Sequence, residues 1–210
     1  MFITFEGIEG CGKTTQARLL AARLETCGQK TLVTREPGGA AISEQIRAVL
    51  LDHRNDGMDP MAEALLYEAA RAQFVSEIVQ PALAKGITVI CDRFTDSTLA
   101  YQGYGRGLDL TVLETLNEIA TGGLQPAVTF LLDIPVAEGL KRRERGGDWN
   151  RMDNAGRAFH ERVYNGYQML ARAEPNRWRI IDARGAVPDV ADAIWAAGAS
   201  IVDPVAAAHD

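Results

Sequence analysis

Gly7-Ile8-Glu9-Gly10-Cys11-Gly12-Lys13-Thr14 is the stretch of this 210-residue chain that decides its fold. It matches the pattern G-x-x-x-x-G-K-[ST] at every fixed position. It directly follows an apolar run, FITFE, and opens a segment of helical character, TTQARLLAARLE. Glycines let backbone N–H groups turn inward around a phosphate, and the N-terminus of a helix adds a favourable dipole. The stretch therefore predicts a phosphate-binding loop between a strand and a helix.

Four side chains in or near this loop have expected roles. Lys13 would reach the β- and γ-phosphates of a bound nucleotide, and the Thr14 hydroxyl would ligate Mg²⁺. Asp92 ends another apolar run, ITVICD, where a carboxylate can orient Mg²⁺ or its waters; a helix cap is the alternative. Arg93 follows at once and suggests a second anionic ligand beside the first. The helix N-terminus could also lower the pKa of the Cys11 thiol.

The rest of the chain alternates short β-branched runs with longer stretches of helical period. Strands are expected at residues 2–6, 31–35, 87–92, 128–133 and 178–182. Helical stretches are expected at residues 13–27, 41–52, 60–84, 109–121, 136–144, 154–173 and 188–202. This alternation predicts one α/β domain over residues 1–210, with a five-stranded parallel sheet flanked by helices. The charged, glycine-containing residues 142–153 are interpreted as a short mobile lid, with an inert solvated loop as the alternative.

Composition argues against several classes of protein. The net charge of −6 makes sequence-independent binding to nucleic acid a poor expectation. No run approaches 18 apolar residues, and the opening residues MFITFEGIEG show no signal peptide, so we expect no membrane partner. Three cysteines without paired spacing argue against a disulfide framework and fit a reducing compartment. We therefore expect a cytoplasmic protein.

Three classes of nucleotide-binding protein compete. A regulatory GTPase needs an N-K-x-D motif, which the chain lacks. A motor ATPase usually has an acidic pair after an apolar strand, whereas here the strand is followed by Asp92 and Arg93. A kinase needs a second substrate site and a way of excluding water, and Arg93 and the arginine-rich lid supply candidates for both. The residues alone favour a phosphotransferase without naming its acceptor.

A series of motifs in order carries a resemblance to a known family. They are FEGIEGCGKTTQ, TREPGG, IRAVLLD, LLYEAARAQ, DRFTDSTLAYQGYGRGLD, LLDIPVAEGLKR and the lid that ends in RMD. The pattern D-R-x-x-x-S-T-x-A-Y-Q-G is the most specific, because adenylate, guanylate and cytidylate kinases lack it. Nearly from end to end, the chain resembles bacterial thymidylate kinases. The resemblance implies a P-loop NTPase fold, phosphorylation of dTMP to dTDP with MgATP, and a homodimer.

The resemblance also implies an acceptor site. Its dTMP-binding residues would be Glu9, Pro37, Arg47, Tyr67, Arg71, Arg93, Thr98, Tyr101 and Gln102. In the family, the residue at Glu9 meets the 3′-hydroxyl, those at Arg47 and Arg93 grip the 5′-phosphate, and that at Arg71 contacts thymine O4. Tyr67 would stack on the base, where the family more often has Phe; a core aromatic is the alternative. Thr98 and Gln102 would line the thymine edge, Tyr101 would crowd C2′ of the sugar, and Pro37 would shape the pocket through an unusual peptide bond.

The donor site and the lid follow from the same resemblance. ATP would be bound by Gly7, Ile8, Glu9, Gly10, Cys11, Gly12, Lys13, Thr14, Thr15 and Arg142, with Arg142 packed on adenine. Thr14 and Asp92 would hold Mg²⁺, and the catalytic residues would be Lys13, Arg93, Arg145 and Arg151. Arg143 could replace Arg145, because the spacing of the lid departs slightly from the family pattern. Leu65, Phe74 and Ile78 could contribute to a dimer interface or pack in the core.

Overall fold

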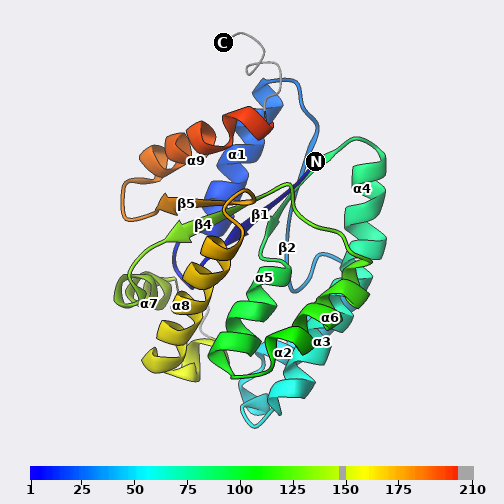
Figure 1. Ribbon diagram of the computed structural model, residues 1–210, viewed down its shortest axis with the longest axis vertical. Coiled ribbons are helices and arrows are strands. Elements are labelled where there is room, and N and C mark those ends of the chain that lie inside the picture. Colours follow the sequence, from blue (N-terminus) through cyan, green and yellow to red (C-terminus); the bar gives the residue numbers. More distant parts are fainter. Residues whose placement is uncertain (147–149, 203–210) are drawn as a thin grey trace.

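The computed structural model describes residues 1–146 and 150–202 and contains one sheet of five parallel strands (Figure 1). The strands follow the order β2-β3-β1-β4-β5. Their bounds are β1 (Phe2–Glu6), β2 (Thr31–Arg35), β3 (Thr88–Asp92), β4 (Val128–Asp133) and β5 (Trp178–Asp182). All five predicted strands are confirmed, the third beginning one residue late. β1 and β3 are buried along their whole length, as strands covered on both faces should be.

Helices cover both faces of the sheet. They are α1 (Lys13–Thr26), α2 (Ala41–Leu51), α3 (Pro60–Phe74), α4 (Gln80–Ala84), α5 (Thr95–Thr98), α6 (Leu110–Thr121), α7 (Val136–Arg145), α8 (Arg157–Ala173) and α9 (Val187–Val202). Shorter helical segments are η1 (His53–Asn55), η2 (Val75–Val79), η3 (Leu99–Gly105) and η4 (Asp153–Ala155). α1 packs beside α9 on one face, while α8 runs along η3 on the other (Figure 1). Among the described helices, none has both the length and the apolar character needed to cross a bilayer.

One helical segment was not expected from the sequence. α5 and η3 form a continuous helical stretch directly after β3, and η3 is a π-helical turn. The sequence TDSTLAYQGYG contains two threonines, two tyrosines and two glycines, residue types with low helix propensity. Tertiary packing holds the segment instead: Tyr101 and Gln102 are buried, and a Cβ on Gly105 would come within 2.7 Å of the Phe159 ring of α8. Burial against α8 overrides the weak local preference.

The residues proposed for a dimer interface fall in different environments. Phe74 is fully buried in a cluster with Phe2, Val75, Val79 and Phe94, so it packs in the core, the second of its two alternatives. Ile78 is partly buried and packs against the same cluster. Leu65 is 49% exposed and remains available to a partner. Helical periodicity could not separate these cases, because the core and an interface both require an apolar stripe.

Gly139 is the point where α7 rests on the phosphate loop. A Cβ at this position would lie 2.6 Å from the Glu9 carbonyl oxygen and 2.9 Å from Ile8 Cδ1. Gly139→Ala should therefore lower the free energy of unfolding by about 1–3 kcal/mol, the usual cost of overpacking, although alanine is the better helix former. Chemical denaturation measures this change.

Gly57→Ala is the matched control for that substitution. Nothing lies within 4 Å of a Cβ at Gly57, and its backbone is not in the left-handed region. Its free energy of unfolding should stay within about 0.5 kcal/mol of the wild type. Equal effects of the two substitutions would contradict tight packing of α7 on the loop.

Candidate active site

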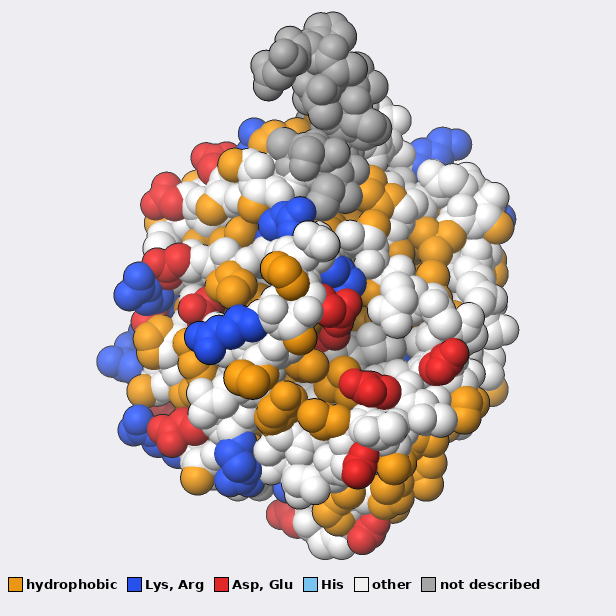
Figure 2. Space-filling view, in the orientation of Figure 1, with side chains coloured by type: hydrophobic (Ala, Val, Ile, Leu, Met, Phe, Trp, Pro, Cys, Tyr) orange, Lys and Arg blue, Asp and Glu red, His pale blue; other side chains and the backbone are white. Residues whose placement is uncertain are grey.

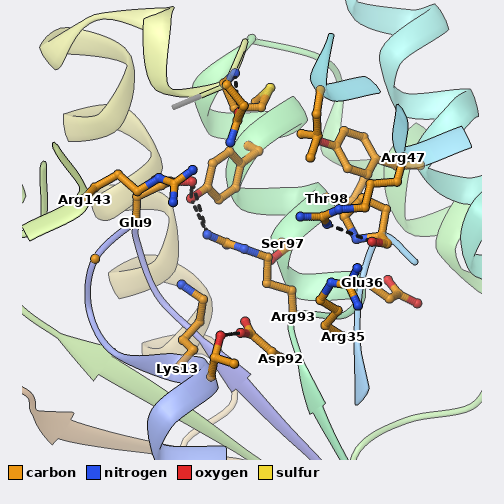
Figure 3. Close-up of a pocket in the computed structure, with 18 of the residues that line it drawn as sticks. Glu9, Lys13, Arg35, Glu36, Arg47, Asp92, Arg93, Ser97, Thr98 and Arg143 are labelled. Carbon is orange, nitrogen blue, oxygen red and sulfur yellow. Dashed lines mark hydrogen bonds and ion pairs between the residues drawn. The ribbon is translucent and has the colours of Figure 1, made fainter. Parts of the chain in front are cut away.

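A cavity of about 430 Å³ opens where the carboxyl ends of β1 and β3 meet (Figure 3). It brings together most of the sequence-predicted residues: Glu9, Gly10, Gly12, Lys13, Thr14, Thr15, Pro37, Arg47, Tyr67, Arg71, Asp92, Arg93, Thr98, Tyr101, Gln102 and Arg142. The predicted residues outside its lining are Gly7, Ile8, Cys11, Arg145 and Arg151. Both expected substrate sites therefore share one cavity.

The phosphate loop forms one end of this cavity. Lys13 Nζ donates to the carbonyl oxygens of Gly7 at 3.0 Å and Ile8 at 2.9 Å, so the side chain curls back over its own loop. Helix α1 begins at Lys13, immediately after Gly12, whose φ of +96° suits glycine. The loop thus presents a helix N-terminus and a cation to the cavity, the combination that binds phosphate.

Thr14 and Asp92 meet beside the loop because Thr14 lies at the start of α1, which follows β1, and Asp92 ends β3, the neighbour of β1. β1 and β3 are paired in parallel, with Phe5 opposite Asp92, and the Thr14 hydroxyl donates to the Asp92 carboxylate. These two oxygen donors fit Mg²⁺, a hard cation that prefers oxygen ligands. The described residues contain no cluster of three His, Cys, Asp or Glu side chains that could hold a metal alone. Magnesium here would take its remaining ligands from phosphate and water, its usual mode at kinase sites.

Cys11 carries a buried thiol in the phosphate loop. Burial raises the pKa of its thiol, although the charges of Lys13 and Arg93 act in the opposite direction. The expectation that the helix N-terminus would lower this pKa is wrong. Loss of hydration outweighs the favourable charges around the thiolate.

Arg93 stands at the centre of the cavity, between the loop and α8. It is the one described non-glycine residue in the left-handed region, with φ +74°, a conformation that the surroundings must enforce. Its guanidinium donates to Glu9 at 3.1 Å (Figure 3). It also donates to the hydroxyl oxygens of Tyr101 at 3.0 Å, Tyr167 at 3.1 Å and Ser97 at 3.2 Å. These contacts aim a half-buried cation into the cavity.

Glu9 is the anionic partner of Arg93. Its Oε1 accepts the Tyr101 hydroxyl at 2.6 Å, and its Oε2 lies 3.4 Å from Nδ1 of the buried His160. Burial on its own would raise the pKa of Glu9, but the neighbouring His160 and the charges of Arg93 and Lys13 hold it well below its usual range. Glu9 is therefore ionised and can only accept hydrogen bonds.

The opposite end of the cavity is built around Arg71. Its guanidinium is 2% exposed and donates to Glu36, Glu68, Thr98, Asn117 and the Phe94 carbonyl. Burial raises the pKa of Glu36 to about 7, although the charge of Arg71 counteracts part of that shift. The Glu36–Pro37 peptide bond is cis, which confirms the unusual bond expected at Pro37. Arg47 Nη1 donates to the Pro37 carbonyl at 2.8 Å, and the half-buried Tyr67 lines the same wall.

The lid arginines have three different surroundings. Arg142 lines the cavity and donates to the carbonyls of Ala183 at 3.0 Å and Arg184 at 3.3 Å. Arg143 also lines it, held by the Asp153 carboxylate at 3.0 Å. Arg145 is exposed on the last turn of α7. Residues 147–149 of the expected lid lie outside the described residues.

Arg151 is buried away from the cavity. It donates to the Leu50 carbonyl at 2.8 Å and to Glu63 at 2.5 Å, and it is 4% exposed. In this arrangement its guanidinium ties the end of the lid to α2 and α3. The catalytic roles of Arg145 and Arg151 stay predictions.

The comparisons with known proteins agree with this geometry. The family model described as thymidylate kinase matches residues 5–194. The chain belongs to the thymidylate kinase family. Thymidylate kinases of Citrifermentans bemidjiense and Trichlorobacter lovleyi are 56% and 54% identical to it, over 89% and 92% of this chain and 85% and 94% of theirs. The crystal structure of thymidylate kinase from Ehrlichia chaffeensis matches with a TM-score of 0.76 and 33% identity, covering 92% of this chain and 96% of that one.

In this thymidylate kinase family member, sequence reasoning missed several residues at and behind the cavity. Glu36 and Ser97 lie inside the motifs TREPGG and D-R-x-x-x-S-T, so a signal for both was present. Glu6, Tyr167 and His160 contact the predicted residues Arg93 or Glu9 directly or through Ser97. Tyr167 and His160 come from α8, whose amphipathic pattern marks them only as core.

Glu6 holds the backbone of the Arg93 turn. Its carboxylate accepts the Phe94 N–H at 2.8 Å, the Ser97 hydroxyl at 2.6 Å and the Tyr167 hydroxyl at 2.7 Å. Burial, with a smaller contribution from the charge of Asp96, raises the pKa of Glu6 to about 7. As pH rises, the unfolded chain therefore loses the Glu6 proton first, and the folded protein keeps it until a higher pH.

This shift predicts a pH dependence of stability. The contribution of Glu6 is full below the ordinary glutamate pKa of 4.5 and is lost as pH rises through about 7. Glu6→Gln should flatten the fall in unfolding free energy between about pH 4.5 and 7, by up to about 3 kcal/mol. Denaturant titrations across this range measure the slope, with the exposed Glu114→Gln as control. Parallel curves for wild type and Glu6→Gln would contradict the raised pKa.

Proposed function

We propose that this protein phosphorylates dTMP to dTDP with ATP as the phosphoryl donor. The observation that carries the proposal is the arrangement of one cavity. The phosphate loop carries an ionised carboxylate, Glu9, which forms an ion pair of 3.1 Å with the half-buried Arg93. The loop suits the donor, and the pair suits an acceptor that carries both a hydroxyl and a phosphate. Membership of the thymidylate kinase family supplies the identity of that acceptor.

The acceptor would be bound by groups that match its chemistry. The fork of Arg93, with help from Arg47, suits the 5′-phosphate. The Glu9 carboxylate suits the 3′-hydroxyl, because an acceptor-only group selects a donor. Tyr101, held by Glu9, would crowd C2′ and disfavour a ribonucleotide. Tyr67 would stack on the base, with Arg71, Thr98 and Gln102 along its edge.

The reaction needs no covalent protein intermediate. A phosphate oxygen of dTMP attacks the γ-phosphorus in line, the bond to the β–γ bridging oxygen breaks, and that oxygen leaves with ADP. Catalysis comes from positioning and charge neutralisation, to which Lys13 contributes at the β- and γ-phosphates. Mg²⁺, held by Thr14 and Asp92, supplies further neutralisation of phosphate charge when bound.

We propose that the chain works as one domain with a lid over residues 142–153. Closing such a lid would exclude water and bring arginines to the phosphates together. Arg142 would pack on adenine, since it already lies at the cavity beside the Ala183 and Arg184 carbonyls. We also propose a cytoplasmic location.

A homodimer is supported by apolar side chains exposed on neighbouring helices. Hydrophobic side chains gather at the lower right of Figure 2, over α2, α3 and α6 of Figure 1. The helices expose Ile42 and Val49 of α2, Leu65 of α3, and Val112 and Ile119 of α6, the last at 74%. A patch of this kind typically marks an interaction surface.

Another pyrimidine nucleotide kinase is the alternative, because the phosphate-binding groups alone do not name the base. Coupled ADP-release assays with dTMP, dUMP, dCMP, UMP and thymidine separate the two. We expect the highest kcat/KM with dTMP. A higher value with any other acceptor would replace the proposed function.

Arg93 should matter for the acceptor far more than for ATP. Losing a buried charge-assisted contact costs on the order of 1.5–3 kcal/mol, so Arg93→Ala should raise KM for dTMP roughly tenfold to a hundredfold. KM for ATP should change little. Arg93→Lys keeps the charge but loses the fork, and Arg18→Ala, on the exposed side of α1, serves as control. Equal weakening of both substrates would point to a structural arginine.

The lid should act in the transition state. Lys13 is the cationic side chain of the phosphate loop, so further charge must come from the lid. We expect Arg145→Ala to lower kcat by roughly 10²-fold and to leave dTMP binding unchanged. This loss is smaller than that of a dedicated arginine finger, because several arginines share the role. Steady-state kinetics of Arg143→Ala and Arg151→Ala provide the comparison. If Arg145→Ala keeps the wild-type kcat while Arg143→Ala or Arg151→Ala loses activity, the catalytic role belongs to Arg143 or Arg151 instead.

A further inference from the structure

Glu63 lies behind the cavity and accepts hydrogen bonds from three side chains. It lies in the first turn of α3 and is fully buried. Its Oε1 accepts from Gln102 Nε2 at 2.8 Å and from Arg106 Nε at 3.2 Å. Its Oε2 accepts from Arg106 Nη2 at 3.1 Å and from Arg151 Nη2 at 2.5 Å. Glu63 is absent from the cavity lining, whereas Gln102 is part of it.

These contacts keep Glu63 ionised. Burial alone would raise the pKa of a carboxyl group, but the hydrogen bonds from Arg106 and Gln102 and the charges of both arginines lower the pKa of Glu63. An ionised carboxylate has no proton to donate. Every group that faces Glu63 must therefore present a donor to it.

This requirement fixes the side-chain amide of Gln102. An amide has one donor end and one acceptor end, and rotation by half a turn exchanges them. Turning the Gln102 carbonyl toward Glu63 would place two acceptors in contact inside a buried site, which is costly. The NH₂ group therefore faces Glu63, and the carbonyl oxygen is the end left for the cavity.

We propose that Glu63 is a positioning residue for base selection: it orients the Gln102 carbonyl so that the cavity accepts the N3–H of a thymine or uracil base and disfavours cytosine. The inference rests on the proposed function and adds the cause of its base specificity. Thymine carries a proton on N3, whereas neutral cytosine has a lone pair there. A carbonyl oxygen in a fixed orientation attracts the N3 proton of thymine and repels the N3 lone pair of cytosine. Discrimination between the two bases therefore includes a repulsive element.

The test compares two acceptors in four variants. The measured quantity is the ratio of kcat/KM for dTMP to kcat/KM for dCMP, supported by calorimetric binding of both nucleotides. Glu63→Gln keeps the shape but can satisfy Gln102 in either orientation, so the ratio should fall about tenfold, mainly through KM. Gln102→Met removes the amide and should lower the ratio similarly. Glu63→Asp withdraws the carboxylate by one methylene and should lower it as well.

Arg106→Met is the control for general loosening. It removes two hydrogen bonds to Glu63 but leaves Gln102 and Arg151 in contact with it. Its melting temperature should fall while the ratio stays within about twofold of the wild type.

A wild-type ratio in folded Glu63→Gln would overturn the proposal, and so would an equal fall in Arg106→Met. If Glu63→Gln does not fold, Glu63→Asp decides in its place, and a wild-type ratio in Gln102→Met overturns the proposal whatever the others do. A wild-type protein that fails to phosphorylate dTMP refutes the proposed function instead. In that case the binding preference for dTMP over dCMP, and its dependence on Glu63, still tests the inference.

Discussion

The pairing of arginines with carboxylates inside the protein, fully or partly buried, is the interaction on which the rest of this structure depends. Arg93 and Glu9 form such a pair at the middle of the cavity. Arg71 lies between Glu36 and Glu68 at one end. Glu63 forms ion pairs with Arg106 and Arg151 behind the cavity. Each charge is tolerable away from water only because its partner is fixed beside it.

Such pairs are weak evidence for stability, because desolvation offsets most of the attraction between them. Their value here lies in orientation. Arg93 sits in a left-handed backbone conformation, and Glu6 holds that turn through the Phe94 N–H. Glu63 restricts the Gln102 amide to one orientation in the same way. A rigid, pre-oriented set of polar groups suits phosphoryl transfer, in which the protein contributes position and charge rather than covalent chemistry.

The topology of the sheet explains why these groups meet. β1 leads into the phosphate loop, and its neighbour β3 leads into Asp92 and Arg93, so both chemical segments emerge at the same edge. More than 70 residues separate Thr14 from Asp92 along the chain, yet their side chains are hydrogen-bonded. α8 then adds Tyr167 and His160 from the opposite side of the cavity.

Local sequence was sufficient for the strands, most helices and the phosphate loop. Their signals are short-range: runs of apolar residues, helical periodicity and glycines at fixed spacing, as in residues 7–14. Together with the resemblance, the motifs also named most of the residues that line the cavity. The tertiary structure alone decided the helix at residues 95–105, the burial of Phe74 and the raised pKa of Cys11. It likewise revealed Glu6, Glu63 and His160 behind the site, because packing, desolvation and contacts between distant segments leave no mark on the local pattern.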